Sequence, residues 1–317
     1  MNDWFTISLF VAAITVVCLI IFIYLKEWQL IRYCENIIKK NSFTFYKAFS
    51  KIEHKKQRQA IYVVYAFCRY ADDLIDEYQD IKGLNQLELE LKAFKNNQKT
   101  SLKVFQALKL IKDDFYGDAY DYQPYFDMIQ GQRMDITIQT YETMEDVLEY
   151  CYYVASSVGL MLLPILAPNN HQKLKEFAIK LGYAMQITNF LRDVGEDFKK
   201  GRVYIPQTYL KKYDVDIKKE MTSSPSENFK KLFDDLANQA RQYYKYAYQH
   251  IDFFSKDVAK PLLYAAKLYE AILDECITDY DVFTKKHFVS DNKKIASLLI
   301  SEDSPHLPAE ILFKVHE

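Results

Sequence analysis

Two aspartates that could hold a cation lie one helical turn apart in an otherwise apolar segment. Asp72 and Asp76 follow Tyr65 and Arg69 at spacings of four, three and four residues, so all four side chains share one face of an α-helix. Burying two like charges is costly unless cations compensate them. Mg²⁺ prefers oxygen ligands and is usually held by one or two carboxylates together with substrate phosphates. The segment therefore predicts a magnesium-dependent site that binds phosphate groups.

A second polar stripe has the same character. Its members, at spacings of four, three, four and four residues among apolar neighbours, are Gly182, Gln186, Asn189, Asp193 and Asp197. This spacing predicts a single helix with one polar face. A lone acidic pair is usually a solvated helix face, but two pairs inside apolar helices, each with amide, Arg or Tyr partners, favour a functional site. If the stripes face each other across a bundle, they form a cavity with an acidic mouth, which suits a substrate with a diphosphate head and a long apolar tail.

The composition argues against several other kinds of protein. The chain has 317 residues, 50% of them hydrophobic, and a net charge of −2, which predicts a large core and gives no support for nucleic-acid binding. Only seven residues are glycine, and neither a dinucleotide fingerprint nor a Walker loop occurs. The five cysteines and six histidines show no zinc-site spacing, and the cysteines are interpreted as reduced core residues in a cytoplasmic environment.

The two stripes need helices to position them, and helical periodicity runs through residues 29–300. Apolar residues recur at spacings of three and four, with little strict alternation. We therefore predict an all-α protein, a single helical bundle around a central cavity. Breaks are expected where Gly, Pro, Ser, Asn or Asp gather, near Lys82–Asn85, Asp113–Gln123, Pro168–His171, Gly201–Thr208 and Thr222–Glu227. Residues 301–317 are expected to form a weakly ordered tail.

The N-terminal segment predicts a membrane anchor over residues 1–28. Trp4 to Leu25 form 22 positions without a charge, and at about 1.5 Å per residue they span the roughly 30 Å of a bilayer core. A cleaved signal peptide is the alternative, but its apolar region is usually about 7–15 residues long and follows basic residues. Here the first basic residue is Lys26. The positive-inside bias then predicts a single-pass cell-membrane protein with a cytoplasmic catalytic domain, whose residues 4–25 contact the lipid bilayer.

Five motifs occur in the order and spacing of a known family. They read N-S-F-T-F (41–45), Y-A-F-C-R-x-x-D-D-L-I-D (65–76), G-Q-R-M-D (131–135), Y-C-Y-x-V-A-x-x-V-G (150–159) and Q-I-T-N-F-L-R-D-V-G-E-D-x-x-x-G-R-V-Y-I-P (186–206). In these motifs the chain resembles the squalene/phytoene synthase family, and most of all its bacterial dehydrosqualene (4,4'-diapophytoene) synthases, over about residues 30–290. The resemblance implies an isoprenoid-synthase-like helical bundle.

The resemblance also implies roles for individual residues. Magnesium ligands are implied on two sides of the cavity, Asp72 and Asp76 on one side and Asn189, Asp193 and Asp197 on the other. Tyr65 and Arg69 join the four aspartates as catalytic residues, and both also contact substrate. The remaining implied substrate-binding residues are Asn41, Ser42, Thr44, Tyr150, Gln186, Asn189, Arg192, Arg202, Tyr204 and Tyr269.

Several of these residues keep a structural alternative. Ser42 and Thr44 match hydroxyls that contact diphosphate, but Ser and Thr also cap helices. Asp73 points about 100° away from Asp72 on a helix, and a salt bridge within the protein is as good an interpretation as a metal ligand. Relatives often carry a basic residue in a late stretch that closes over phosphate. Here the register of residues 285–294 is uncertain, with Asn292 near the expected position, and no late phosphate ligand is assigned.

The implied reaction is a head-to-head (1-1') condensation, carried out by residues 29–300 as a prenyl-diphosphate condensing domain. Two farnesyl diphosphates would form a cyclopropylcarbinyl diphosphate and then dehydrosqualene, with release of pyrophosphate, as the first step of carotenoid biosynthesis. Phe49 and Tyr62 are expected to line and shorten the tail channel, which favours this thirty-carbon product.

Other products and roles stay open. A phytoene synthase would join two geranylgeranyl diphosphates, and a squalene synthase would add a reduction by NADPH, a cofactor that we do not expect here. A non-catalytic assembly or scaffold relative is a more remote alternative, because such a protein should have lost metal-binding aspartates. A downstream carotenoid desaturase is an expected partner.

Overall fold

The computed structural model describes residues 3–117 and 120–290, and every regular element in these ranges is a helix. The first half of the chain contains α1 (Asp3–Asn41), α2 (Phe43–Phe49), α3 (Lys55–Asp76), α4 (Ile81–Lys95), α5 (Lys103–Phe115), α6 (Gln123–Thr137), α7 (Met144–Cys151), the π-helical turn η1 (Tyr152–Ser156) and α8 (Ser157–Leu166). The second half contains the 3₁₀ turn η2 (His171–Leu174), α9 (Lys175–Arg192), α10 (Val194–Lys199), α11 (Gln207–Tyr213), α12 (Ile217–Glu220), α13 (Glu227–Gln249), the 3₁₀ turn η3 (Ile251–Phe253) and α14 (Lys256–Ile277). The predicted all-α fold is confirmed.

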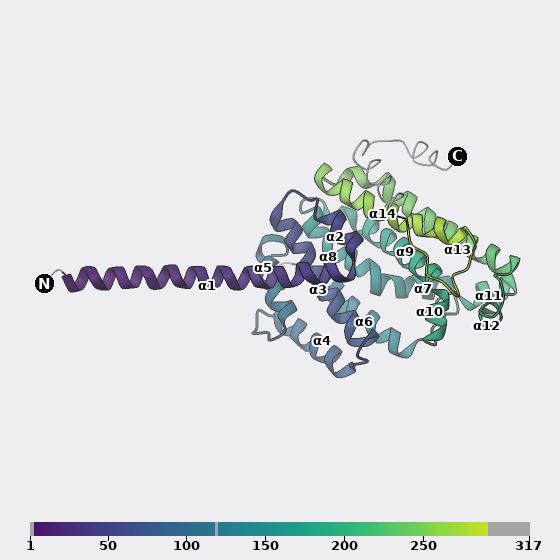
Figure 1. Cartoon of the computed structure of the whole chain (residues 1–317), viewed down its shortest axis with the longest axis horizontal. Coiled ribbons are helices and arrows are strands. Elements are labelled where there is room, and N and C mark those ends of the chain that lie inside the picture. Colours follow the sequence, from purple (N-terminus) through teal and green to yellow (C-terminus); the bar gives the residue numbers. More distant parts are fainter. Residues whose placement is uncertain (1–2, 118–119, 291–317) are drawn as a thin grey trace.

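Helix α1 projects from one end of the bundle (Figure 1). Its projecting part is exposed at Trp4 (82% exposed) and from Ile7 to Trp28 (55%), whereas Leu30, Cys34 and Ile38 are buried against the bundle. The helix passes residue 28 without a break. One helix therefore combines a freely projecting apolar half with a half that belongs to the core.

Two helical stretches in the described part of the chain are long and apolar enough to cross a membrane. The first, Ile7–Asn41, has no buried residue in its most apolar window. In the second, Met144–Leu166, 44% of that window is buried inside the bundle, as expected for a core helix. The projecting part of α1 is thus the stretch whose apolar surface has no partner among the residues that the structure describes.

The two helices that carry the polar stripes lie in the interior of the bundle. Helix α3 packs against α1, α5, α6 and α8, while α9 packs against α8, α13, α14 and η1. Their apolar sides belong to one core, with Phe67 of α3 and Leu191 of α9 both fully buried. Because neighbouring helices surround both, α3 and α9 form a firm frame for the residues between them.

A π-helical turn lies where α6, α8 and α9 meet. Turn η1 contacts both α6 and α9, and Gly182 lets α9 approach it, since a Cβ at Gly182 would lie 2.6 Å from Ser156 Cα. Gly131 of α6 has the same role on the other side, where a Cβ would lie 3.1 Å from Tyr153 Cβ. Gly182, the first member of the second polar stripe, therefore serves close helix packing.

The expected break at Lys82–Asn85 is wrong, because these residues lie inside α4. The chain leaves the helical conformation earlier, at residues 77–80. Asp80 caps α4 by accepting a hydrogen bond from the N–H of Gly83 (2.9 Å), so this glycine belongs to a first helical turn and not to a loop. The other four expected breaks coincide with connections between helices.

The second polar stripe does not lie on a single helix, contrary to the prediction. Asp193 lies between α9 and α10, at φ −106° and ψ 15°. The N–H of Gly195 leaves the helical pattern and donates to the carbonyl oxygen of Val282 (3.1 Å). This contact with a segment near the end of the described chain outweighs the local helical preference. Asp193 and Asp197 nevertheless stay one turn apart, since the N–H of Asp197 donates to the carbonyl of Asp193 (2.9 Å).

Candidate active site

The first acidic cluster lies at the C-terminal end of α3. Asp72 and Asp76 are one turn apart there, and the Asp72 carboxylate accepts a hydrogen bond from Gln132 Nε2 of α6 (2.6 Å). Burial, followed by repulsion from Asp76, raises the pKa of Asp72 to about 7. A carboxylate whose charge is this unfavourable gains most from a cation brought close to it.

Arg69 is committed to the protein in this structure. Its guanidinium pairs with Asp73 and also with Glu77, at 2.6 Å from Glu77 Oε1. Asp73 could have been a metal ligand or part of a salt bridge. In the structure it forms the salt bridge, with Arg69. Arg69 lies one turn from Asp72 and acts on it through its charge, which lowers the pKa of Asp72 against the larger effect of burial.

The second acidic cluster lies at the bend between α9 and α10. Arg192 holds Asp193 with two hydrogen bonds, from Nε (2.8 Å) and from Nη2 (2.5 Å). Burial and the charge of Asp193 raise the pKa of Asp197 to about 7. Asn189 donates from Nδ2 to Gln186 Oε1 (3.3 Å), and its side-chain amide oxygen Oδ1 is buried without a hydrogen-bond partner among the described residues. An unsatisfied buried oxygen beside two aspartates is what a cation-binding site would need.

Two basic residues link the clusters. Arg202 Nη1 lies 3.1 Å from Asp76 Oδ1 of the first cluster, and its backbone N–H donates to the carbonyl of Asp197 in the second (2.9 Å). Lys200 hydrogen bonds to Glu196, which raises the pKa of the lysine, and Asp76 and Asp197 attract the same ammonium. The loop that carries Arg202 is fixed by Val203, whose N–H donates to the carbonyl of Gln139 (2.8 Å). The two predicted stripes therefore converge on one site.

Asp135 is a buried carboxylate of this site that the sequence reasoning did not single out. It accepts hydrogen bonds from the hydroxyls of Tyr150 (2.6 Å) and Tyr204 (3.0 Å). Burial raises its pKa, and its charge acts on Asp72. The sequence does contain a sign of this role. Gln132 and Asp135 are three residues apart in the 131–135 motif, so both lie on one face of α6.

In this structure Tyr150 and Tyr204 are bonded within the protein, and their contact with substrate stays a prediction. Their rings pack in a stack with Phe190, with 4.2 Å between the ring centroids of Phe190 and Tyr204, and they are only 3% and 8% exposed. Both hydroxyls are directed at Asp135. They position the Asp135 carboxylate, whose charge acts on Asp72 of the first cluster.

Lys286 supplies the late basic residue that the sequence left unassigned. Its ammonium lies 3.2 Å from Asp193 Oδ1 and 3.0 Å from Glu196 Oε2. Gly195 makes this possible, because a Cβ there would lie 2.6 Å from Phe283 Cα and would push the segment carrying Lys286 away. Asn292, the position considered from the sequence, lies outside the described residues.

An apolar cavity of about 130 Å³ lies beside Tyr65, about two helical turns from Asp72 along α3. Tyr65 of α3 and Met185 of α9 line it, together with the rings of Phe45 and Phe49 of α2. Phe49 thus lines this cavity, and its effect on the length of the prenyl tail stays a prediction. Tyr62 is not among the described lining residues and instead packs against Tyr46, with 5.9 Å between the ring centroids.

The cavity extends from Tyr65 toward the end of the bundle from which α1 projects. Tyr65 and Ile61 line it on α3 in that direction, away from Asp72. Leu166, the last residue of α8, also lines it. Its neighbour Ile165 accepts a hydrogen bond from Gln57 near the beginning of α3 (2.6 Å). A substrate would therefore lie along the axis of α3, with its diphosphate head at the C-terminal end of the helix and its apolar tail in the cavity.

The remaining predicted residues lie on α14 and near the junction of α1 and α2. Tyr269 of α14 is partly buried, lies close enough to Arg192 and Asp193 for their charges to affect its pKa, and stacks on Phe45 at 5.3 Å between ring centroids. Ser42 precedes α2 as its N-cap residue, yet its side chain makes no capping hydrogen bond. The three polar residues between α1 and the cavity-lining rings of α2 are Asn41, Ser42 and Thr44. Asn41 donates to the carbonyl of Ile37 (3.0 Å).

The donor set fits a hard cation that shares its coordination with substrate. Within residues 3–117 and 120–290, no group of three or more His, Cys, Asp or Glu side chains is arranged to hold a metal by itself. Each cluster instead offers a pair of aspartates, and the second adds the side-chain Oδ1 of Asn189, which has no hydrogen-bond partner within the described residues. Magnesium sites of this kind take one or two carboxylates and complete their octahedron with water and phosphate oxygens.

Comparison with proteins of known sequence agrees with this geometry. Residues 38–291 match the model of the squalene/phytoene synthase family. The chain is 34% identical to a 4,4'-diapophytoene synthase of Staphylococcus haemolyticus over 249 residues, which cover 77% of this chain and 86% of the relative. It is 32% identical to a 15-cis-phytoene synthase of Synechococcus elongatus over 285 residues, 84% of this chain and 91% of the relative.

Solved structures give the same result. A dehydrosqualene synthase in complex with a ligand superimposes with a TM-score of 0.82 at 38% identity, covering 88% of this chain and 97% of that one. The squalene synthase HpnC from Alicyclobacillus acidocaldarius shares the fold, with a TM-score of 0.71 at 23% identity over 80% of this chain and 94% of that one. Enzymes of this family use divalent metal ions to bind diphosphate. The chain belongs to the squalene/phytoene synthase family, and it is a prenyltransferase-type enzyme of isoprenoid biosynthesis that joins prenyl diphosphates head to head.

Proposed function

We propose that this enzyme condenses two farnesyl diphosphates into dehydrosqualene (4,4'-diapophytoene), releasing pyrophosphate at the start of carotenoid biosynthesis. Two observations carry the proposal: two aspartate clusters converge, linked by Arg202, and an apolar cavity lies beside Tyr65, about two helical turns from Asp72 along α3. The rings of Phe45 and Phe49 narrow that cavity, which supports a fifteen-carbon tail. The 38% identical dehydrosqualene synthase supports the same product.

The acidic residues would hold magnesium in two groups. Asp72 and Asp76 form the first, and Asn189, Asp193 and Asp197 form the second. Bound there, magnesium would supply Lewis-acid stabilisation of the leaving diphosphate. The raised pKa values of Asp72 and Asp197 support this assignment, because both carboxylates lack sufficient compensating charge in the protein alone.

The basic residues would exchange carboxylate partners for phosphate. Arg202 and Lys286 each pair with a carboxylate of the site, and a diphosphate entering between the clusters offers them oxygens of higher charge. Arg guanidinium groups bind phosphate in a bidentate manner. Arg69 and Arg192 would mainly hold the aspartates in place, because both are already paired with them. The polar residues implied by the resemblance to contact the substrate heads are Asn41, Ser42, Thr44, Gln186 and Tyr269.

The cavity walls would protect the cationic stages of the reaction. Loss of diphosphate from one farnesyl group leaves an allylic cation, which the double bond of the second substrate attacks. One proton and one further diphosphate then leave, and a second proton is lost after rearrangement, so the product forms without a reductant. Tyr65 and the aromatic rings beside it exclude water and face positive charge with their π-systems. The released pyrophosphate is the nearest base for both protons.

Product analysis tests the proposal. Purified full-length enzyme with Mg²⁺ should convert farnesyl diphosphate to dehydrosqualene, with the same yield and product whether or not NADPH is present. A phytoene synthase is the second candidate, supported by the 32% identical phytoene synthase. Turnover of geranylgeranyl diphosphate alone would establish that candidate and overturn the thirty-carbon product. Formation of squalene that requires NADPH would instead identify the enzyme as a squalene synthase.

We also infer that α1 anchors the enzyme. Residues 4–25 would cross the cell membrane once, with residues 29–300 as the condensing domain in the cytoplasm. The exposed apolar surface from Trp4 to Leu25 supports this, as does the hydrocarbon nature of the product, which a downstream carotenoid desaturase would have to receive from the bilayer. The enzyme should stay in the membrane fraction after alkaline carbonate washing, and its release in soluble form would contradict the anchor.

A further inference from the structure

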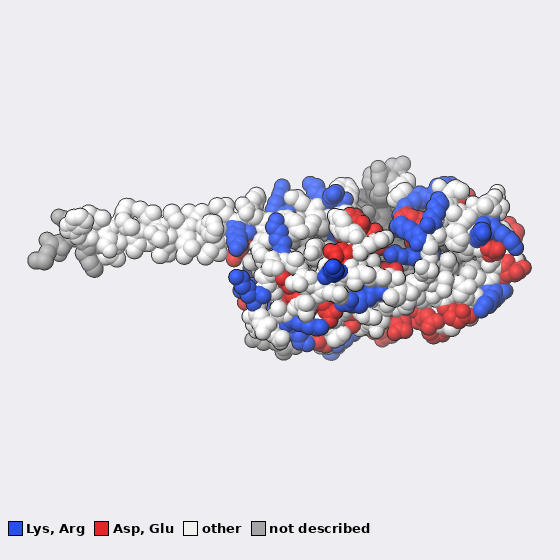
Figure 2. Space-filling model, turned by 90° about the horizontal axis from the view of Figure 1, so that it is seen from below, with Lys and Arg blue, Asp and Glu red and all other residues white. Residues whose placement is uncertain are grey.

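The face of the bundle around the base of α1 carries a group of lysines that the reaction does not use. Figure 2 shows Lys and Arg side chains gathered where the bundle meets the projecting helix, which carries no charge from Trp4 to Leu25. We call this end of the bundle, defined by the two hollows described below, the basal face. It lies at the opposite end of α3 from Asp72 and Asp76, since Lys55 and Lys56 begin that helix and Asp76 ends it.

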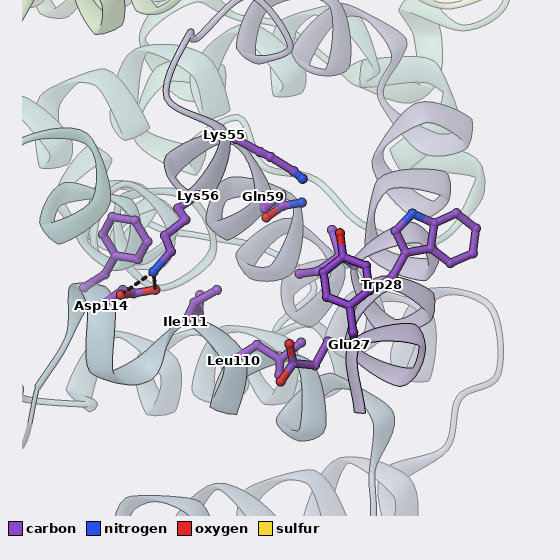
Figure 3. A pocket seen from close by; sticks show the side chains of 11 residues that line it. Glu27, Trp28, Lys55, Lys56, Gln59, Leu110, Ile111 and Asp114 are labelled. Atoms are coloured by element: carbon purple, nitrogen blue, oxygen red, sulfur yellow. Dashed lines mark hydrogen bonds and ion pairs between the residues drawn. The ribbon is translucent and has the colours of Figure 1, made fainter. Parts of the chain in front are cut away.

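The first hollow, of about 240 Å³, lies between α1, the beginning of α3 and the end of α5. Tyr24 and Trp28 contribute aromatic rings from α1, and Leu110 adds an apolar wall from α5. Figure 3 shows Lys55 reaching into this hollow, while Lys56 turns to Asp114 at 2.9 Å. The hollow thus combines an apolar wall with an available ammonium group at its rim.

The second hollow, of about 700 Å³, lies on another side of α1, against α5 and the connection between α4 and α5. Lys26, Lys99 and Lys109 line it with exposed side chains. Lys112, the fourth lysine, is buried and bonded to Asn97. Together the two hollows contain six lysines and three carboxylates, Glu27, Asp113 and Asp114, so the basal face is positively charged.

The position of the basal face along α1 identifies what it would meet. The uncharged segment ends at Leu25, and Leu30 is already buried in the bundle. Five residues of helix rise by about 7.5 Å, and the polar layer of a bilayer is roughly 5–8 Å thick on each side of its core. If α1 spans the core, both hollows lie within the headgroup layer. Basic residues there attract anionic lipids.

We propose that the basal face binds the headgroups of anionic membrane lipids, with acyl chains against Tyr24, Trp28 and Leu110 and phosphates on Lys26, Lys55, Lys99 and Lys109. This rests on the proposed anchoring of α1 and goes beyond it, because an apolar span alone would not distinguish one lipid from another. The binding would fix the orientation of the bundle on the membrane. It would also keep the apolar end of the cavity turned toward the bilayer.

The two tryptophans of the chain provide a direct test, since Trp28 lies in the first hollow and Trp4 near the far end of the span. The full-length Trp4→Phe enzyme, which keeps Trp28 alone, is reconstituted in vesicles of phosphatidylcholine and phosphatidylglycerol. Two vesicle samples are compared. In one only the phosphatidylglycerol, and in the other only the phosphatidylcholine, carries brominated chains that quench tryptophan fluorescence. We expect Trp28 to be quenched about two- to fivefold more effectively per brominated phosphatidylglycerol than per brominated phosphatidylcholine, the range that an exposed ion pair gives.

A charge variant and a matched control separate the basal face from the anchor. In the Trp4→Phe background, Lys26→Gln, Lys99→Gln and Lys109→Gln together should remove the preference for phosphatidylglycerol but keep the quenching. Lys211→Gln, Lys218→Gln and Lys219→Gln, which change the same charge on α11 and α12 at the far end of the bundle (Figure 1), should keep both. Equal quenching by the two lipids would overturn the basal-face proposal and leave the anchor standing. Absence of quenching by either lipid would overturn both.

Discussion

Asp72 and Asp197 are carboxylates whose ionised forms are unfavourable in the protein alone. Burial is the larger cause in both cases, and a second aspartate one turn away is the next, so the pKa of each rises to about 7. Groups of this kind are frequent at functional sites, because the substrate or metal supplies the missing charge. The protein thus gives up stability at these positions in exchange for cation binding.

The cost can be measured through the pH dependence of stability. Asp72 titrates at about 7 in the folded enzyme and near its ordinary 3.8 when unfolded, so between these values the folded state binds the extra proton and stability falls as pH rises. Asp72→Asn cannot ionise. In chelator-treated enzyme we expect its free energy of unfolding to exceed that of the wild type by roughly 2 kcal/mol at pH 8 and by much less at pH 4. Asp113→Asn, at an exposed aspartate of the basal face, should show no such gain, and a less stable Asp72→Asn at pH 8 would contradict the account.

Lys286 gives a second test at the residue scale. If its ammonium passes from Asp193 and Glu196 to the substrate diphosphate, Lys286→Gln should raise the KM for farnesyl diphosphate by about tenfold, the effect of one charge-assisted hydrogen bond. Lys285→Gln is the matched control, because Lys285 pairs with Asp279 outside the site. Steady-state kinetics of the two variants decide the point, and equal KM values would remove Lys286 from the site.

Local spacing explains which site residues could be predicted. Asp72 and Asp76 lie on one helix, so their spacing of four residues already predicts that their side chains are neighbours on one face. Lys286 and Asp193 are brought together by the packing of Gly195 against Phe283, and no periodicity records such a contact. Asp135 was missed for a related reason, since its role comes from Tyr150 and Tyr204, which lie on other elements.

At the scale of elements, the site depends on where helices end as much as on where they run. Helix α3 carries its carboxylates to its last turn, whereas α9 bends at Asp193 under the contact of Gly195 with Val282. The uniform helical periodicity of residues 175–199 could not reveal this bend, because the contact that causes it comes from residues more than eighty positions later in the chain. The helical class and four of the five expected breaks followed from composition and spacing alone.

Helix α2 should control the length of the prenyl chain. Phe49 lines the cavity while Tyr62 does not, so Phe49→Ala should lengthen the space available to the tail. We expect the ratio of kcat/KM for geranylgeranyl over farnesyl diphosphate to rise by at least about tenfold, within the range of discrimination that an apolar pocket achieves. Tyr62→Phe is the control and should leave this ratio unchanged. A ratio that responds to Tyr62 and not to Phe49 would place the end of the tail elsewhere.

At the scale of the whole molecule, the parts follow one axis. The acidic clusters lie at the end of α3, the apolar cavity extends back along it, and α1 leaves the bundle at its beginning. About 30 Å of helix separate Lys56 from Asp76. Substrate heads would therefore react in the aqueous phase, away from the membrane, while the growing hydrocarbon lies on the membrane side.

Removal of the projecting segment tests whether α1 serves membrane attachment and product release while the bundle alone carries out the reaction. Because Leu30, Cys34 and Ile38 are buried and the residues before them are exposed, an enzyme lacking residues 1–28 should fold, remain soluble and turn over farnesyl diphosphate in detergent at the rate of the full chain. Its product should accumulate in the protein when vesicles are absent. Sedimentation and product extraction provide the measurement. A truncated enzyme that still pellets with membranes would show that α1 is not the sole attachment.

The central claim is that the two acidic clusters act as one metal-dependent site. Its most direct test is the rate of pyrophosphate release from farnesyl diphosphate at saturating Mg²⁺, compared among the wild type, Asp76→Asn, Asp197→Asn and the double variant. Groups that act as a unit lose function together and not additively. The account predicts a fall of about a thousandfold in each single variant and no further fall in the double variant. Wild-type turnover in either single variant would contradict it.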